Sequence, residues 1–139
     1  MATSGLSAFL EDEILDQLFG AAAYTAPTPI WFALYSAAPT KAGGGTELTG
    51  NGYGRVSATN NLTTWAASSS SVKLSDIDIT LGPATGGAWS EATHWGIFDA
   101  ETVGNLLCWG PLTVARTAGE GDSIKFTAGD ISISLDNVT

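Results

Sequence analysis

Two short apolar runs separated by a turn-like segment form the most marked pattern in the chain. His94–Phe98 is apolar and aromatic, and so is Asn105–Trp109, while the residues between them place an Asp and a Gly where a turn needs them. This pattern predicts a β-hairpin. Because both runs are nearly continuous in apolar residues, we expect the hairpin to be buried on much of both faces.

Further apolar runs predict strands along the rest of the chain. They cover residues 30–36, 53–59, 72–81, 123–128 and 131–135, and residues 112–115 prolong the second hairpin strand beyond Pro111, where we expect a bend or a sheet edge. Residues 123–128 and 131–135 flank Gly129-Asp130 and are predicted to pair as a closing hairpin. About eight strands at short spacing favour an all-β fold, an antiparallel β-sandwich or jelly roll. The residues expected in or near its core are Trp31, Leu34, Ile97, Leu106 and Trp109.

Side-chain alternation within two of these runs predicts which residues face outward. In 72–81 the apolar positions alternate with Asp76 and Asp78, which lack the further oxygen ligands of a calcium loop and are expected on the exposed face. In 53–59 the same alternation places Tyr53 and Arg55 on one face of the strand. Residues 60–71 fit a weak strand and a loop equally well.

The N-terminal segment carries the one helical pattern in the sequence. Leu6, Leu10, Ile14 and Leu18 recur every four residues with Phe9 beside them, Ser4 or Ser7 can cap the start, and Gly20 suits the stop. We therefore expect an arm and helix over residues 1–20 within one domain of residues 1–139. The helix either covers a sheet edge or docks on a neighbouring subunit, which makes interface candidates of Leu6, Phe9, Leu10 and Ile14.

Composition and charge exclude several classes of partner. Charged residues make up only 14% of the 139 residues, the net charge is −9, and the five basic residues are scattered singly. This argues against nucleic acid and against an anionic membrane surface. The lone Cys108 excludes an internal disulfide, and the sequence shows neither a signal-peptide pattern nor a run of membrane-spanning length. We expect synthesis and folding in a cytoplasm, with Cys108 as an inert core residue.

No constellation of catalytic, cofactor-binding or metal-ligating residues emerges. His94 is the only histidine and precedes Trp95 in a buried-looking strand, so a structural role is favoured over that of a catalytic base. Glu91, Asp99 and Glu101 read as solvated loop acids, and Gly43–Gly45 lacks the Gly-Lys-Ser/Thr ending of a phosphate loop. We therefore expect no enzymatic activity and no cofactor.

Two tryptophans lie in polar stretches rather than in predicted strands. Trp65 follows a Ser/Thr/Asn-rich segment, and Trp89 ends a Gly-rich loop. A tryptophan in such a loop can anchor a protein interface, contact a sugar, or fold back on the sheet. Trp65 and Trp89 are therefore further interface candidates.

Several short motifs, in their order and spacing, resemble a known family. They are the helix 9–20, Tyr24-Thr-Ala-Pro27, Trp31-Phe-Ala-Leu-Tyr35, Gly45-Thr-Glu-Leu-Thr-Gly50, Gly52-Tyr-Gly-Arg55, Thr93-His-Trp-Gly-Ile-Phe-Asp-Ala100, Gly104-Asn-Leu-Leu107, Gly121-Asp122 and Gly129-Asp130. From Leu6 to Leu135 the chain is similar to small virion proteins of tailed bacteriophages, labelled capsid cement (decoration) proteins or tail-fibre-like proteins. The family pattern often has Tyr-Ala-Arg where this chain has Tyr53-Gly-Arg55. The resemblance implies a non-enzymatic structural role.

Two positions on the virion fit this resemblance. The compact size and the absence of a coiled-coil stem favour a cement protein that binds the outer surface of the phage head, as a jelly-roll homodimer on the major capsid protein. The alternative is a tail or tail-fibre component, with receptor or carbohydrate contact through Trp65 and Trp89. We expect the first, and hence a location on the capsid surface.

Overall fold

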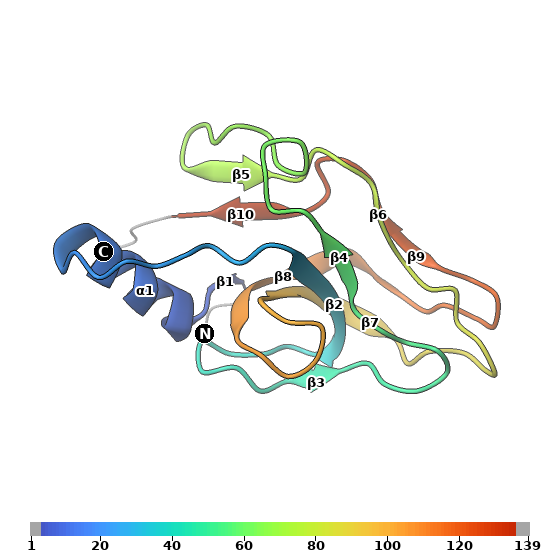
Figure 1. Ribbon diagram of the computed structural model, residues 1–139. Helices are drawn as coiled ribbons and strands as arrows, with labels where there is room; N and C mark the ends of the chain where they lie inside the picture. The colour runs from blue at the N-terminus through green and yellow to red at the C-terminus, as the bar shows by residue number, and fades with distance from the viewer. Residues whose placement is uncertain (1–3, 136–139) are drawn as a thin grey trace.

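A computed structural model describes residues 4–135 of the chain (Figure 1). The part described is mainly β-structure with one helix. The elements are β1 (Gly5–Leu6), α1 (Ala8–Phe19), β2 (Ile30–Ala37), β3 (Thr46–Glu47), β4 (Val56–Ala58), β5 (Val72–Leu74), β6 (Ile79–Leu81), β7 (Ala92–Phe98), β8 (Leu106–Arg116), β9 (Ile124–Phe126) and β10 (Ser132–Ser134). The predicted all-β class with an N-terminal helix is confirmed.

The main sheet is built around the hairpin of β7 and β8. Its strand order is β1-β8-β7-β2-β3, and β4 pairs with β2 beside β3, all antiparallel. The hairpin and the strand at 30–36 are therefore confirmed. The predicted strand at 53–59 is shorter than expected, because only Val56–Ala58 pairs with β2.

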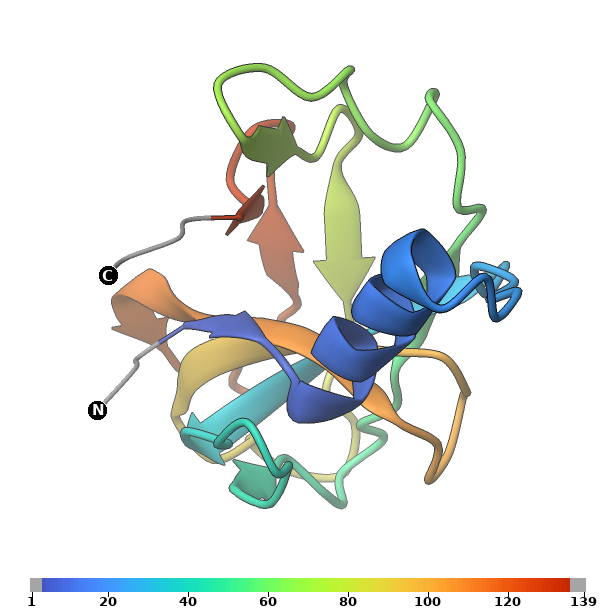
Figure 2. The ribbon, with the colours of Figure 1, turned by 90° about the vertical axis from the view of Figure 1, so that its left-hand side faces the viewer.

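A long interrupted ribbon forms the second layer. β6 pairs with β9, and β5 pairs with β10, both antiparallel. Because β5 and β6 lie on one stretch of chain and β9 and β10 on another, the two pairs form one ribbon with a break between them. Figure 2 shows this ribbon standing over the main sheet. The two layers give the antiparallel sandwich that the sequence predicts.

The predicted closing hairpin is wrong, and so is the single strand over 72–81. β9 and β10 do not pair with each other across Gly129-Asp130, because each pairs with a different half of 72–81. Asp130 Oδ2 accepts hydrogen bonds from Thr127 N and Oγ1, which closes a local turn within the longer strand path. Ser75 Oγ, on the partner stretch, accepts from Gly129 N at 3.2 Å and Ile131 N at 3.3 Å. These contacts replace the regular ladder at the interruption.

Replacing Ser75 tests this arrangement. Ser75 and Ile131 are 2% and 0% exposed, so Ser75→Ala removes the side-chain acceptor of a buried backbone amide, that of Ile131, and is expected to lower the free energy of unfolding by about 1–3 kcal/mol. Chemical denaturation measures the loss. Ser134→Ala, at an exposed position of β10, is the matched control and should have little effect. Equal effects of the two variants would contradict the role given to Ser75.

The main sheet is buried on both faces, as expected for its apolar strands. Between the layers lies a large cluster that includes Leu34 and Ile97. A smaller cluster covers the outer face and consists of Ala33, Tyr35, Phe98, Leu106 and Trp109, with Trp31 packed against it. The five predicted core residues are thus all in or beside the core, divided between its two faces.

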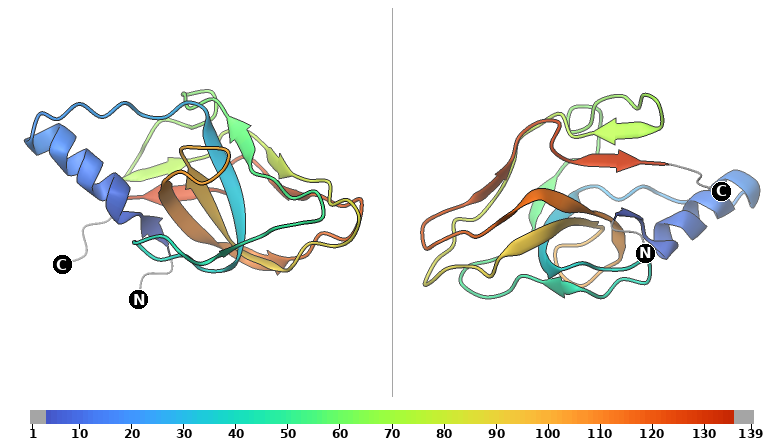
Figure 3. Two further views of the ribbon diagram at one scale, coloured as in Figure 1. Left: turned by 60° about the horizontal axis from the view of Figure 1, so that its bottom comes forward. Right: turned by 180° about the vertical axis from the view of Figure 1, so that it is seen from behind.

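The helix projects from one end of the molecule. α1 begins after Ser7, whose Oγ accepts from Leu10 N at 3.2 Å, and ends at Gly20, whose N–H donates to Asp16 O. Its last turn points away from the sheets (Figure 3). Leu6 lies outside the helix, in β1, where it pairs with Cys108. The expected four-residue stripe is therefore divided between a strand and a helix.

Candidate functional site

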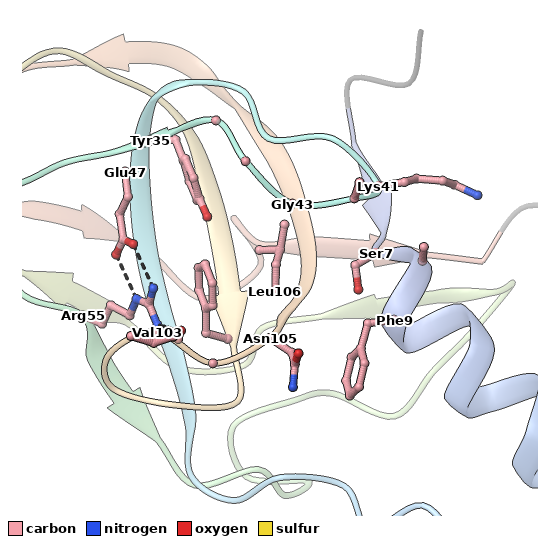
Figure 4. A pocket seen from close by; sticks show the side chains of 16 residues that line it. Ser7, Phe9, Tyr35, Lys41, Gly43, Glu47, Arg55, Val103, Asn105 and Leu106 are labelled. Atoms are coloured by element: carbon pink, nitrogen blue, oxygen red, sulfur yellow. Dashed lines mark hydrogen bonds and ion pairs between the residues drawn. The ribbon is translucent and has the colours of Figure 1, made fainter.

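A hollow of about 600 Å³ opens on the outer face of the main sheet (Figure 4). We call it the outer hollow. Its walls come from five parts of the chain: the start of α1, β2, the loop before β3 with β3 itself, Arg55 just before β4, and the β7–β8 connection with the strand ends beside it. The residues that line it include Tyr35, Lys41, Gly43–Gly45, Glu47, Arg55, Phe98, Val103, Asn105 and Leu106.

A two-pronged ion pair forms one side of the outer hollow. Arg55 Nε lies 2.9 Å from Glu47 Oε1, and Arg55 Nη2 lies 2.8 Å from Glu47 Oε2. The side chains are 7% and 25% exposed, respectively. Burial opposes the charge of Arg55, but the hydrogen bond and charge of Glu47 outweigh it and raise the pKa of the guanidinium. Arg55 is therefore held as a cation in a fixed orientation.

Arg55 also holds the β7–β8 connection. Its Nη1 donates to Ala100 O and Val103 O, each at 2.8 Å, and its guanidinium carbon lies 3.5 Å from the ring centre of Phe98. Val103 has a positive φ of 56°, a conformation that β-branched residues rarely adopt, and its side chain is 84% exposed. Arg55 thus holds the tip of the β7–β8 connection, where the backbone of Val103 is strained, against the main sheet.

Two tyrosines near this pair have different surroundings. Tyr53 Oη accepts from Leu34 N at 2.9 Å and donates to Glu47 Oε1 at 3.0 Å. Tyr35 stacks on Phe98 and is only 3% exposed as a residue, but its phenol oxygen is not a buried unpaired atom, because among residues 4–135 that description applies to Trp109 Nε1. Burial, and then the charge of Glu47, raises the pKa of Tyr35, so the phenol keeps its proton. Figure 4 shows this hydroxyl pointing into the outer hollow.

The opposite rim of the outer hollow is rich in glycine and polar residues. Lys41 Nζ pairs with Glu11 of α1 at 2.7 Å, and the Gly43–Gly45 turn beside it has positive φ at each residue. Asn105 donates from its backbone and its amide to the carboxylate of Asp99. Both cations of the hollow, Lys41 and Arg55, are therefore paired with carboxylates.

The structure places the interface candidates largely within the chain's own core. Leu6, Trp65 and Trp89 are 8%, 5% and 3% exposed, and Phe9, Leu10 and Ile14 are partly buried against the same core cluster. Trp65 contacts Phe32, while the Nε1 of Trp89 donates to Asn51 O. Of the three roles open to the loop tryptophans, the fold shows the third, packing back on the sheet.

The free apolar surface of α1 lies at its far end instead. Leu15, Leu18 and Phe19 are 54%, 66% and 83% exposed. The sequence pattern missed this surface because it grouped Leu18 with the inward-facing residues. Beneath the helix, a second hollow of about 730 Å³ is bordered by Ile14, Leu15, Trp95 and Ile133.

His94 is a half-buried residue of β7 whose Nδ1 lies 2.8 Å from Thr93 Oγ1. Burial lowers its pKa, so the unfolded chain takes up a proton at a higher pH than the folded chain does. The free energy of unfolding should therefore fall as the pH drops below the ordinary value of about 6.5. Denaturation at several pH values should show this decrease to be smaller in His94→Gln. Identical pH profiles for the two proteins would contradict it.

Other chemistry that the sequence raised finds no support in the described part of the chain. Residues 4–135 hold no cluster of three or more His, Cys, Asp or Glu placed to bind a metal. Cys108 is buried, which raises the pKa of its thiol to about 12. No described helix has the length and apolar character needed to cross a membrane. Asp78 is exposed and forms an ion pair with Lys125.

The residues of the outer hollow were not predicted as a site. The sequence offered one signal, the placement of Tyr53 and Arg55 on one strand face, and both prove to contact Glu47. Nothing local indicated that Tyr35 and the β7–β8 connection would meet them.

Comparison with known proteins gives one informative result. Residues 5–134 match the model of a family described as "Podophage GP4 fiber I protein gp80". No curated protein matches the chain. The family match spans all ten described strands and the helix.

Proposed function

The chain belongs to the podophage GP4 fiber I protein family, and from that membership we propose that it is a structural component of the phage tail fibre. It is a bacteriophage virion structural protein, as the resemblance in its motifs implied. The single observation that supports the fibre assignment is the match over residues 5–134, which leaves little of the chain outside the family model.

The family match supports the tail alternative better than the capsid cement role that compactness favoured. The cement argument rested on the absence of a stem within this sequence, and a fibre can be assembled from several short subunits. The proposal includes no enzymatic activity, and its immediate partners are other tail proteins or further copies of this chain. The major capsid protein is the partner only under the cement alternative.

Location on intact virions tests the proposal. Gold-labelled antibodies against the purified chain should bind at the tail when whole particles are viewed by electron microscopy. The same antibodies should detect the protein in separated tails and not in emptied heads. Label over the head would favour the cement role, and its absence from the particle would contradict both.

A further inference from the structure

The sequence contains a single Asn-Gly pair, Asn51-Gly52, which lies in the connection between β3 and β4. Tyr53 N donates to Gly50 O at 2.9 Å, and φ is 50° at Asn51 and 75° at Gly52. These features define a type I′ turn, for which Asn-Gly is a preferred pair because both central residues need positive φ. The pair therefore has a structural reason to be present.

An Asn-Gly pair is also open to spontaneous deamidation, because glycine has no side chain to hinder the attack. The main-chain N of Gly52 attacks Cγ of Asn51, the Cγ–Nδ2 bond breaks, and ammonia leaves with the proton of the Gly52 amide. Water then opens the resulting five-membered ring. Cleavage of its N–Cγ bond gives aspartate, and cleavage of the bond between N and the main-chain carbonyl carbon gives isoaspartate, in which the chain runs through Cγ.

The fold holds Asn51 by its main chain and by its side chain. Its carbonyl oxygen accepts from Thr85 N at 2.8 Å and from Trp89 Nε1 at 2.9 Å, and its Nδ2 donates to Ala88 O at 2.7 Å. All three partners belong to the connection between β6 and β7. Gly52 packs against the same connection, since a Cβ at this position would collide with Thr85 Oγ1.

Ring closure is incompatible with these contacts. The ring needs Cβ of Asn51 and N of Gly52 on the same side of the Cα–C bond, whereas a type I′ turn places them nearly opposite. Rotation about that bond swings the carbonyl oxygen of Asn51 away from Trp89, whose residue is 3% exposed and packs edge-on against Tyr53. The buried indole N–H would then lose its partner, which costs free energy.

We propose that Asn51 is a modification site controlled by folding: the turn contacts protect it in the folded chain, it deamidates in the unfolded chain, and conversion to isoaspartate makes unfolding irreversible. Isoaspartate adds a methylene to the main chain within the turn and moves the carbonyl that Trp89 and Thr85 require. It also lacks Nδ2, so the bond to Ala88 O is lost. This chemistry does not depend on the position of the chain in the virion.

Peptide mapping by mass spectrometry, after incubation of the full chain in mildly alkaline buffer, tests the protection. Trypsin cleaves after Lys41 and Arg55 and so isolates Asn51 in peptide 42–55. In guanidinium chloride, Asn51 should deamidate faster than Asn60 and Asn61, which no glycine follows. In native buffer its conversion should be at least about tenfold slower, because the turn must first open. Equal rates in the two buffers, or no conversion in guanidinium, would overturn the proposal.

Two tryptophan variants distinguish opening of the turn from general destabilisation. Trp89→Phe removes one donor to Asn51 O, so deamidation in native buffer should accelerate by about three- to tenfold, the effect of one neutral hydrogen bond. Trp65→Phe is the matched control, because Trp65 is also buried but packs on Phe32, and it should not accelerate the reaction. Equal acceleration in both variants would show that the turn contacts do not control the site.

Refolding tests the consequence of the modification. After increasing times in guanidinium, the fraction of the parent chain that refolds on dilution should fall as the isoaspartate content rises, with circular dichroism as the measurement. Asn51→Gly lacks the reacting amide and tolerates the positive φ, so it should refold fully after the same incubation. Full refolding of the converted parent, or an equal loss in Asn51→Gly, would show that this modification does not make unfolding irreversible.

Discussion

We expect Arg55→Met to lower the free energy of unfolding by about 3–5 kcal/mol, the usual cost of removing one partner from a buried ion pair. The guanidinium is 7% exposed and hydrogen-bonds the two oxygens of Glu47 and the carbonyls of Ala100 and Val103. Methionine keeps much of the packing on Phe98 but leaves these acceptors unpaired. Denaturant-induced unfolding measures the change.

A second ion pair provides the matched control. Lys125 Nζ lies 2.7 Å from Asp78 Oδ2, at least as close as Arg55 lies to Glu47, but the two side chains are about half exposed. Lys125→Met should therefore cost less than about 1 kcal/mol. Arg55→Lys should recover only part of the stability, because an ammonium cannot make the two-pronged contact. Similar losses in Arg55→Met and Lys125→Met would contradict the role of Arg55 as the clamp of the β7–β8 connection.

The sequence predicted the elements whose signals are local. The β7–β8 hairpin and β2 are long apolar runs, and Ser7 and Gly20 bound a helix by the rules of capping. These elements form because burial and capping depend on residues close in sequence. Their prediction therefore needed no knowledge of the rest of the fold.

Pairing between distant segments was not predictable in the same way. Gly129-Asp130 is a strong hairpin signal, yet the strands beside it pair with β5 and β6, some fifty residues earlier in the chain. Each of β9 and β10 has only three residues in its ladder, so the local pairing has little advantage over the long-range one. The hydrogen bonds of Ser75 then decide between them.

The candidate site was largely hidden for a related reason. Glu47 and Arg55 lie eight positions apart, but the pair becomes significant only when the β7–β8 connection supplies Phe98 and two carbonyls. Trp89 illustrates the same limit, because its polar neighbours in sequence suggested exposure while Tyr53 and Asn51 bury it. Polar sequence context marks a loop but does not show where the side chain in it points.

The far end of α1 is where we expect the chain to contact another virion subunit. The helix has no buried residue, and at twelve residues it is short for a helix that must be stable unaided. Its exposed Leu18 and Phe19 lie on the part that projects from the sheets, away from Phe9 and Leu10, which pack on the core. An assembly contact would bury these two side chains.

Leu18→Ser combined with Phe19→Ser should therefore leave the free energy of unfolding within about 0.5 kcal/mol of the parent, because both positions are exposed. Incorporation into virions should fall by at least two powers of ten, since burying a Leu and a Phe contributes roughly 3–6 kcal/mol to a contact. Immunoblots of purified particles produced with each variant measure this. Leu62→Ser, a similar change at a residue 71% exposed in a distant loop, should not reduce incorporation. Phe9→Ala with Leu10→Ala should instead destabilise the domain. Normal incorporation of the Leu18 and Phe19 double variant would show that α1 is not an assembly contact.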